Sequence, residues 1–242
     1  MPLEAYQVVF NTSIRFKESL PTTEKEVVGL FGEVMGKVAG LEDYRHEGDD
    51  FHLAERIAGN LARQILFQKK TITVAVAPPH ALAVADETAR LVYSLISHHL
   101  NPPLLVLELM DVSFRFEFPF KGNHDLLVLR GLFGNSPYAE LAAASKGAVR
   151  SFQPVLNLSL TSDHSVIALI EIRTSTTSRE IESGEYDGDE IRVLCGVARV
   201  RGLAQQRLEE TYASLYAEAV AFVEQKLVPL LVEPLRSATL QT

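Results

Sequence analysis

Apolar and polar positions change their spacing along the first half of the chain, and the changes mark successive elements. Alternation with β-branched side chains is typical of strands, whereas apolar side chains three or four positions apart are typical of helices. The predicted elements are a strand over residues 5–17, a helix over 24–40, a polar loop over 42–52, a helix over 52–68, a strand over 71–77, and a helix capped by Asp86 that runs to about Leu100. Asn101-Pro102-Pro103 then breaks the chain.

The second half opens with a long β-type run and closes with a long amphipathic helix. Its predicted elements are strands over residues 104–120 and 126–133, a helix capped by Ser136 with Pro137 at its first position, strands over 154–162, 165–178 and 190–200, and a helix from about Gln205 to Ser237 that Pro229 and Pro234 bend or end. The short links between the last three strands predict antiparallel hairpins.

A tetrapeptide occurs twice, as Ser-Ile-Arg-Phe at 13–16 and as Ser-Phe-Arg-Phe at 113–116. Each half opens with a strand that carries this pattern, continues with helical material, returns to strands, and closes on a helix. We therefore predict an α+β fold, a pseudo-duplicated antiparallel sheet that helices cover on one face, with a long C-terminal helix. The expected halves are residues 1–103 and 104–242, joined strand to strand in one continuous sheet.

Three stretches carry a resemblance to other proteins, namely TSIRFKES, VSFRFEFP and IRVLCGVARVRG. In its order of elements the chain resembles a sporadically distributed family of uncharacterised bacterial proteins of about this length. The duplicated halves of that family look like the saddle of the TATA-box-binding protein. The resemblance covers most of the chain. It implies a fold but no activity, because the family has no established one.

Composition narrows the classes of function. The 242 residues carry a formal net charge of −8, which argues against a general nucleic-acid or anionic-membrane surface because phosphate binding needs clustered Lys and Arg. The single cysteine, Cys195, excludes an intramolecular disulfide, fits a reducing compartment, and is expected to be a buried small hydrophobe. The first residues lack a signal-peptide pattern and no apolar run is long enough to span a bilayer, so we expect a cytoplasmic protein without a membrane segment.

Anion binding is one hypothesis for the polar residues of the strands and loops. Arg15 and Arg115 alternate with apolar residues, so both are expected on the polar face of the sheet, where they bind an anion or a carboxylate, or are simply solvated. Asn135 and Ser136 stand where a predicted strand meets a predicted helix, a position that suits an anion at a helix N-terminus. The P-loop lysine is missing there.

Metal binding is a second hypothesis, because acidic and imidazole side chains crowd one predicted loop. The candidate ligands are His46, Asp49, Asp50 and His52, which suit zinc or manganese. The alternative is a solvated polar loop, since no further anchored ligand accompanies the two histidines. His124-Asp125 and Asp163-His164 are expected in turns, where Asp and His tolerate unusual backbone angles.

No motif in the sequence names a reaction, since G-x-S-x-G, H-E-x-x-H and C-x-x-C are all missing. We therefore expect a non-catalytic interaction or binding module without a cofactor, which associates with itself or with a protein partner. Aromatic strands such as FRFEFPF are expected to offer exposed edges for pairing. The alternatives are a protein that binds a small anionic molecule and a metal-dependent hydrolase or nuclease.

Overall fold

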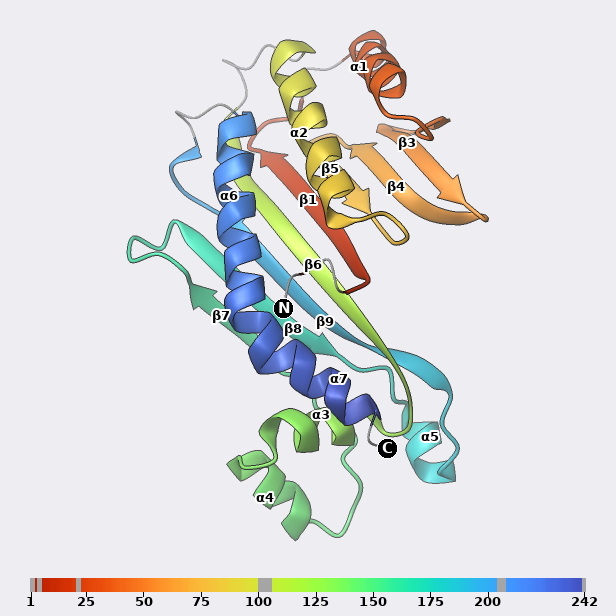
Figure 1. The fold of residues 1–242 in the computed structure, drawn as a ribbon, viewed down its shortest axis with the longest axis vertical. Helices are drawn as coiled ribbons and strands as arrows, with labels where there is room; N and C mark the ends of the chain where they lie inside the picture. Colours follow the sequence, from red (N-terminus) through yellow and green to blue (C-terminus); the bar gives the residue numbers. More distant parts are fainter. Residues whose placement is uncertain (1–2, 4–5, 21–22, 100–105, 204–207, 241–242) are drawn as a thin grey trace.

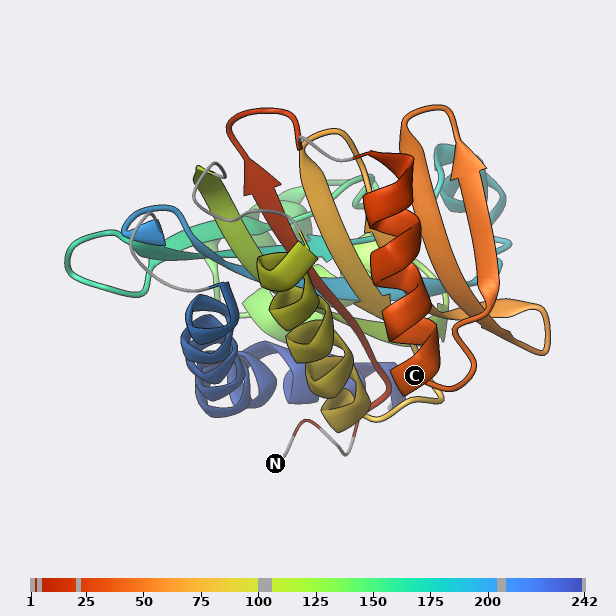
Figure 2. The same ribbon diagram turned by 90° about the horizontal axis from the view of Figure 1, so that it is seen from above.

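A computed structural model describes residues 3, 6–20, 23–99, 106–203 and 208–240. The described part forms a nine-stranded antiparallel sheet in the order β2-β3-β4-β5-β1-β6-β9-β8-β7. The helices α1, α2 and α6 lie on the same side of this sheet (Figure 1, Figure 2). The α+β fold with an antiparallel sheet is therefore confirmed.

The elements of the first half are β1 (Val8–Phe16), α1 (Glu24–Lys37), β2 (Asp43–Glu47), β3 (Asp50–Ile57), β4 (Asn60–Phe67), β5 (Thr71–Val76) and α2 (Leu82–His99). Those of the second half are β6 (Leu107–Lys121), α3 (His124–Phe133), α4 (Pro137–Ala144), β7 (Val155–Ser159), β8 (Val166–Arg173), α5 (Ser178–Ser183), β9 (Gly188–Arg199), α6 (Leu208–Phe222), the π-helical segment η4 (Val223–Val232) and α7 (Glu233–Leu240). The last three follow one another without a break, which confirms the long C-terminal helix. The predicted boundary between the halves lies outside the described residues.

The two first strands of the halves, β1 and β6, pair with each other at the centre of the sheet. Thr12 stands opposite Val112 in this pairing. The neighbouring pairs are Ser13 with Asp111 and Asn11 with Ser113, so the two Ser-x-R-F tetrapeptides lie symmetrically about the Thr12–Val112 pair. This symmetry supports the duplication hypothesis, which stays a prediction.

The hydrophobic core fills the space between the sheet and its helices. Alternate residues of β1 and β6 point into it, among them Phe10, Ile14, Phe114 and Phe116, all buried. Each such side chain contributes about 1.5–3 kcal/mol by leaving water. One polar contact crosses this core, between Thr12 Oγ1 and Tyr93 Oη of α2 at 2.9 Å.

The prediction for residues 42–68 was wrong, because this region forms hairpins rather than a loop and a helix. Strands β3 and β4 are joined by Ala58 and Gly59, whose φ angles are 50° and 84°. Two positive φ angles in a two-residue loop match the twist of the flanking strands and produce a tight hairpin. Helix-forming residues such as Ala62 and Arg63 are thereby placed in a strand, because pairing and burial outweigh propensity.

The predicted strand over 126–133 was also wrong, since this segment belongs to helix α3. Asn123 begins the helix by accepting a hydrogen bond at its side chain from the Leu126 backbone N–H at 2.8 Å. His124 and Asp125, expected in a turn, therefore lie in the first turn of α3 and are buried. Asp163 and His164 do lie in a turn, with a φ of 56° at His164.

Two further predictions were wrong about where a residue or segment lies in the fold. Helix α2 begins at Leu82, so Asp86 is inside the helix and pairs with Arg90 at 2.9 Å instead of capping the helix. The FRFEFPF segment belongs to β6, which pairs with both β1 and β9 at Phe114 and Phe116. The first part of this segment is therefore no edge of the sheet, whereas residues 117–120 pair with β9 only.

Candidate interaction surface

The sheet face away from the helices is uncovered by any described helix (Figure 2). Small polar side chains occupy its centre, and the centre includes the Ser13–Asp111 pair, in which the Ser13 hydroxyl donates to the carboxylate. Burial raises the pKa of Asp111, and the hydrogen bond from Ser13 and the charge of Arg15 offset this effect only in part.

The candidate arginines lie on this open face, and each stands beside a glutamate. Arg15 Nε is 3.0 Å from Glu108 Oε2. Arg115 Nε is 2.8 Å from Glu117 Oε1, a close ionic contact rather than an aligned hydrogen bond. Because a partner carboxylate already neutralises each guanidinium, neither arginine is an unsatisfied anion site.

The two arginines also do not form one site. Arg15 stands opposite Leu109 on β6, whereas Arg115 is itself on β6, opposite Val9. The separation along β6 from Leu109 to Arg115 is roughly 20 Å. The structure thus places them on either side of the sheet centre, in the equivalent positions that a duplicated chain predicts.

The four candidate metal ligands are not brought together. In the β2–β3 hairpin, His46 pairs with Phe51 and His52 pairs with Arg45, which places the two imidazoles on opposite faces of the sheet. The His46 ring stacks on Phe51 at 4.2 Å. The other three candidate ligands have separate surroundings. His52 Nδ1 accepts a hydrogen bond from the Gln64 side chain, and the Asp50 carboxylate accepts one from the Gln68 side chain. Asp49 is exposed in the turn. Nowhere in the described ranges do three His, Cys, Asp or Glu side chains gather as a metal site requires.

Asn135 and Ser136 lie in the link between α3 and α4, not after a strand. The Ser136 hydroxyl donates to the Phe133 carbonyl and leaves the α4 N–H groups without a side-chain cap. The geometry adds no further group that would bind an anion here.

A largely buried ionic cluster lies under the first half of the sheet and consists of Glu55, Arg63 and His80, none of which the sequence indicated as a site residue. The Glu55 carboxylate accepts from Arg63 Nε and contacts His80 Nε2 at 2.8 Å, and Arg63 also donates to the Ala39 carbonyl. Burial raises the pKa of Glu55, but the hydrogen bonds from Arg63 and His80 outweigh it and lower the pKa. Gly40 lies against this carboxylate, where a Cβ would stand 2.5 Å from Glu55 Oε1.

A small pocket adjoins this cluster at the start of α2. Its volume is about 300 Å³, and its lining includes Tyr6, Pro79 and His80. Glu55 and Arg63 stand opposite each other in the β3–β4 hairpin, and His80 comes from the segment before α2. The cluster was not predicted because residues 52–68 were expected to form a helix.

A second buried polar group lies under the other half, at the start of α3. Asp125 accepts hydrogen bonds from the Phe152 backbone N–H and from Thr174 Oγ1. The neighbouring His124 ring lies 2.9 Å from the Phe120 carbonyl through Nε2 and 3.2 Å from Ser175 Oγ through Nδ1. The carbonyl can only accept, so Nε2 carries the proton. These contacts fasten α3 to the segment that leads into β7 and to the segment that follows β8, which is a structural role.

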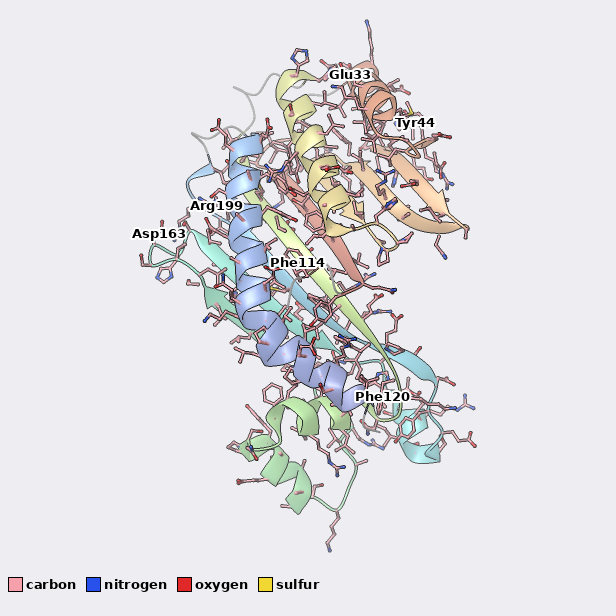
Figure 3. The ribbon with its side chains drawn as sticks, in the orientation of Figure 1. Glu33, Tyr44, Phe114, Phe120, Asp163 and Arg199 are labelled. Carbon is pink, nitrogen blue, oxygen red and sulfur yellow. The ribbon has the colours of Figure 1, made fainter. Side chains whose placement is uncertain are left out.

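The two outer strands of the sheet differ in charge. The β2 strand reads Asp-Tyr-Arg-His-Glu, and Asp43 accepts hydrogen bonds from Arg45 and Arg56. The β7 strand reads Val-Leu-Asn-Leu-Ser, with Val155 63% and Leu156 50% exposed. Figure 3 places Tyr44 of β2 and Asp163 of the β7–β8 turn on opposite sides of the molecule. Charged edges resist pairing with another chain, and β7 lacks that protection.

Helix α4 also exposes apolar side chains. None of its residues is buried, and Tyr138 and Leu141 are 64% and 72% exposed. The Tyr138 ring lies 5.9 Å from Phe152, on the segment that leads into β7. We call α4 and β7 together the apolar end.

No protein-family model and no curated protein sequence matches the chain. Among the helices that the structure describes, none combines the length and the apolar character needed to cross a membrane.

Proposed function

We propose that the protein is a non-catalytic interaction module that associates with itself through the apolar end, α4 and β7. The observation that carries the proposal is the distribution of exposed apolar side chains. The most exposed large ones that the structure describes, at 63–78%, all belong to the second half: Tyr138, Leu141, Val155, Leu230 and Leu240. In the described first half the largest value is 44%, at Val28. Three of these five, Tyr138, Leu141 and Val155, belong to the apolar end, and exposed apolar patches mark protein contact sites.

Sedimentation velocity over a wide range of concentrations tests this proposal. We expect a monomer at low concentration and one closed oligomer, a dimer, at high concentration. Leu141→Glu should weaken association, because it places a charge in the contact surface, whereas Leu61→Glu in the first half should not. A strict monomer at every concentration would refute the proposal.

We also propose three properties that the sequence led us to expect: duplicated halves, a bacterial relationship and a cytoplasmic location. The symmetry of the Ser-x-R-F tetrapeptides supports the first. The single cysteine, buried in β9, is compatible with the last.

A protein that binds a small anionic molecule is the second candidate function, and the pocket beside His80 is the observation that favours it. The pocket, rather than Arg15 or Arg115, is the place to test. Thermal shift with a panel of phosphates and carboxylates should then show stabilisation that His80→Ala abolishes and His98→Ala retains. No shift in the panel would reject this candidate.

The third alternative from the sequence, a metal-dependent hydrolase or nuclease at His46, Asp49, Asp50 and His52, has no support in the structure, because the β2–β3 hairpin holds the two imidazoles on opposite faces of the sheet. Metal analysis of untagged protein tests it directly. A metal content well below one per chain would reject it.

A further inference from the structure

The hydrogen bonds of β7 to β8 determine which backbone groups of β7 remain available. The Ile172 N–H donates to the Pro154 carbonyl at 3.1 Å, and the Leu160 N–H donates to the Val166 carbonyl at 2.9 Å. Bonded pairs alternate along an antiparallel ladder, so Leu156 and Leu158 also face β8 with their backbone groups. Val155, Asn157 and Ser159 therefore direct their N–H and C=O groups away from β8, toward the free edge.

These outward N–H and C=O groups are complementary to the same groups of a second copy that is related by a two-fold rotation. An antiparallel copy centred on Asn157 sets Asn157 opposite the partner's Asn157, and Val155 opposite the partner's Ser159. Every outward N–H then meets an outward C=O, because all three residues are non-proline and belong to hydrogen-bonded pairs. Any other centre sets at least one of these three residues opposite a residue outside β7.

We propose that two copies of the chain join β7 to β7 in this register and form one continuous sheet. This inference rests on the proposed self-association and names its geometry. Figure 1 shows β7 at the outer margin of the sheet with no described element beyond it, so a second strand has room to approach.

The side chains of β7 support the same register. Leu156 and Leu158 point to the helix side, because they pair with Ile170 and Ala168 of β8. In the dimer, Leu156 faces the partner's Leu158 at a non-hydrogen-bonded position, where cross-strand side chains approach most closely. The half-exposed Leu156 thus gains an apolar partner in line with buried Ile170.

The charge of the other edge argues for a second β7 rather than β2 as the occupant. Pairing β7 with β2 would set Asp43, Arg45 and Glu47 against an uncharged strand. Such head-to-tail pairing would also leave a free edge at each end and build an open fibre, whereas β7–β7 pairing closes after two copies.

Cysteine trapping tests the register. Opposed residues of a hydrogen-bonded pair are about 5.5 Å apart at Cα, which lies within the range that a disulfide spans. Asn157→Cys should form a covalent dimer under mild oxidation. Val155→Cys should not, because Val155 and the partner's Val155 lie roughly 13 Å apart in this register. The native Cys195 is buried and should not interfere.

The trapping result separates the failure of this inference from the failure of the proposed function. A dimer in sedimentation whose Asn157→Cys variant traps no faster than Val155→Cys would overturn the β7 register and leave self-association standing. A monomer in sedimentation would remove both.

A charge on the edge supplies a second readout. Leu156→Lys should raise the dissociation constant at least about tenfold, since each dimer then places two ammonium groups in the apolar row. Leu61→Lys, at a partly exposed position in the first half, is the matched control and should leave the constant unchanged. Equal effects of both variants would contradict the inference.

Discussion

The outer strand of the first half, β2, carries Asp43, Arg45 and Glu47, whereas the outer strand of the second half, β7, carries no charged residue. The buried polar groups differ as well. The first half buries an ionic cluster around Glu55, and the second half buries Asp125 against backbone and hydroxyl donors. Each half adds its strands from the centre of the sheet to one margin, so the arrangement of strands does not distinguish the two margins. In the proposed self-association, the charge of the edge strand distinguishes them.

The largest expected effect comes from the ionic cluster of the first half. Arg63→Ala leaves the Glu55 carboxylate buried without its main partner, so we expect the free energy of unfolding to fall by about 3–5 kcal/mol. Urea denaturation measures this loss, and Arg56→Ala, at an exposed ion pair, should cost less than about 1 kcal/mol.

The pH dependence of this loss follows from the lowered pKa of Glu55. Because folding lowers the pKa of this carboxyl group, its ionisation stabilises the fold. The stabilisation is complete at a pH above the ordinary carboxyl pKa, and it is lost as the pH falls through the lowered pKa of the folded state. The difference between wild type and Arg63→Ala should therefore shrink in acid. A difference that is constant with pH would show that the cluster is not ionic.

The corresponding test in the second half is Asp125→Ala, with a smaller expected loss of about 2–3 kcal/mol. The Phe152 N–H and the Thr174 hydroxyl lose a charged acceptor, and both donors are partly buried. Asp187→Ala at an exposed position is the control and should change the urea midpoint little. A loss larger than that of Arg63→Ala would reverse the proposed ranking of the two clusters.

Each half contains one helix with the same capping motif, so equal mutations compare the halves directly. Thr23 caps α1 with Glu26, and Thr177 caps α5 with Glu180. Thr23→Ala should cost about 1 kcal/mol in urea, because α1 buries Val27 and Leu30 in the core. Thr177→Ala should cost less, because α5 buries nothing and can open alone. Hydrogen exchange should show faster exchange in α5 only for the second variant.

The smallest expected effect is at the sheet centre, where Asn11 and Asp111 occupy equivalent places. Burial raises the pKa of Asp111, so its ionisation opposes folding above the ordinary carboxyl range and has no cost in acid. Asp111→Asn should therefore raise the thermal midpoint slightly at neutral pH, and the gain should vanish in acid. A loss at neutral pH would mean that the charge at the centre is stabilised by its neighbours.

The sequence was sufficient to predict the sheet of the second half, because the three hairpin strands alternate strongly and are separated by turn residues. It failed for β3 and β4. Their Ala-Gly turn is a weaker hairpin signal than Asn-Gly, and their Ala, Leu, Arg and Gln residues favour helices in isolation. It also failed for α3, whose short run of Leu and Val has no periodicity that separates a buried helix from a strand.

The candidate site was less predictable than the fold. The period-two pattern correctly placed Arg15 and Arg115 on the polar face, but their glutamate partners depend on strand register. The sequence predicted a strand over 154–162, but its position at the margin of the sheet requires the order of strands. The Glu55–Arg63 pair depends on the β3–β4 hairpin that the sequence did not predict, and His80 joins it only through the tertiary fold.

Cys195, at the middle of β9, makes it possible to measure the opening of the sheet by its reaction with a thiol reagent. The thiol is buried and its pKa is raised to about 12 by burial, so the native chain offers almost no thiolate at neutral pH. A thiol reagent can react only when β9 separates from its neighbours or from the helices. The rate of labelling in native buffer therefore reports how often the sheet opens, and the measurement needs no substitution in the chain.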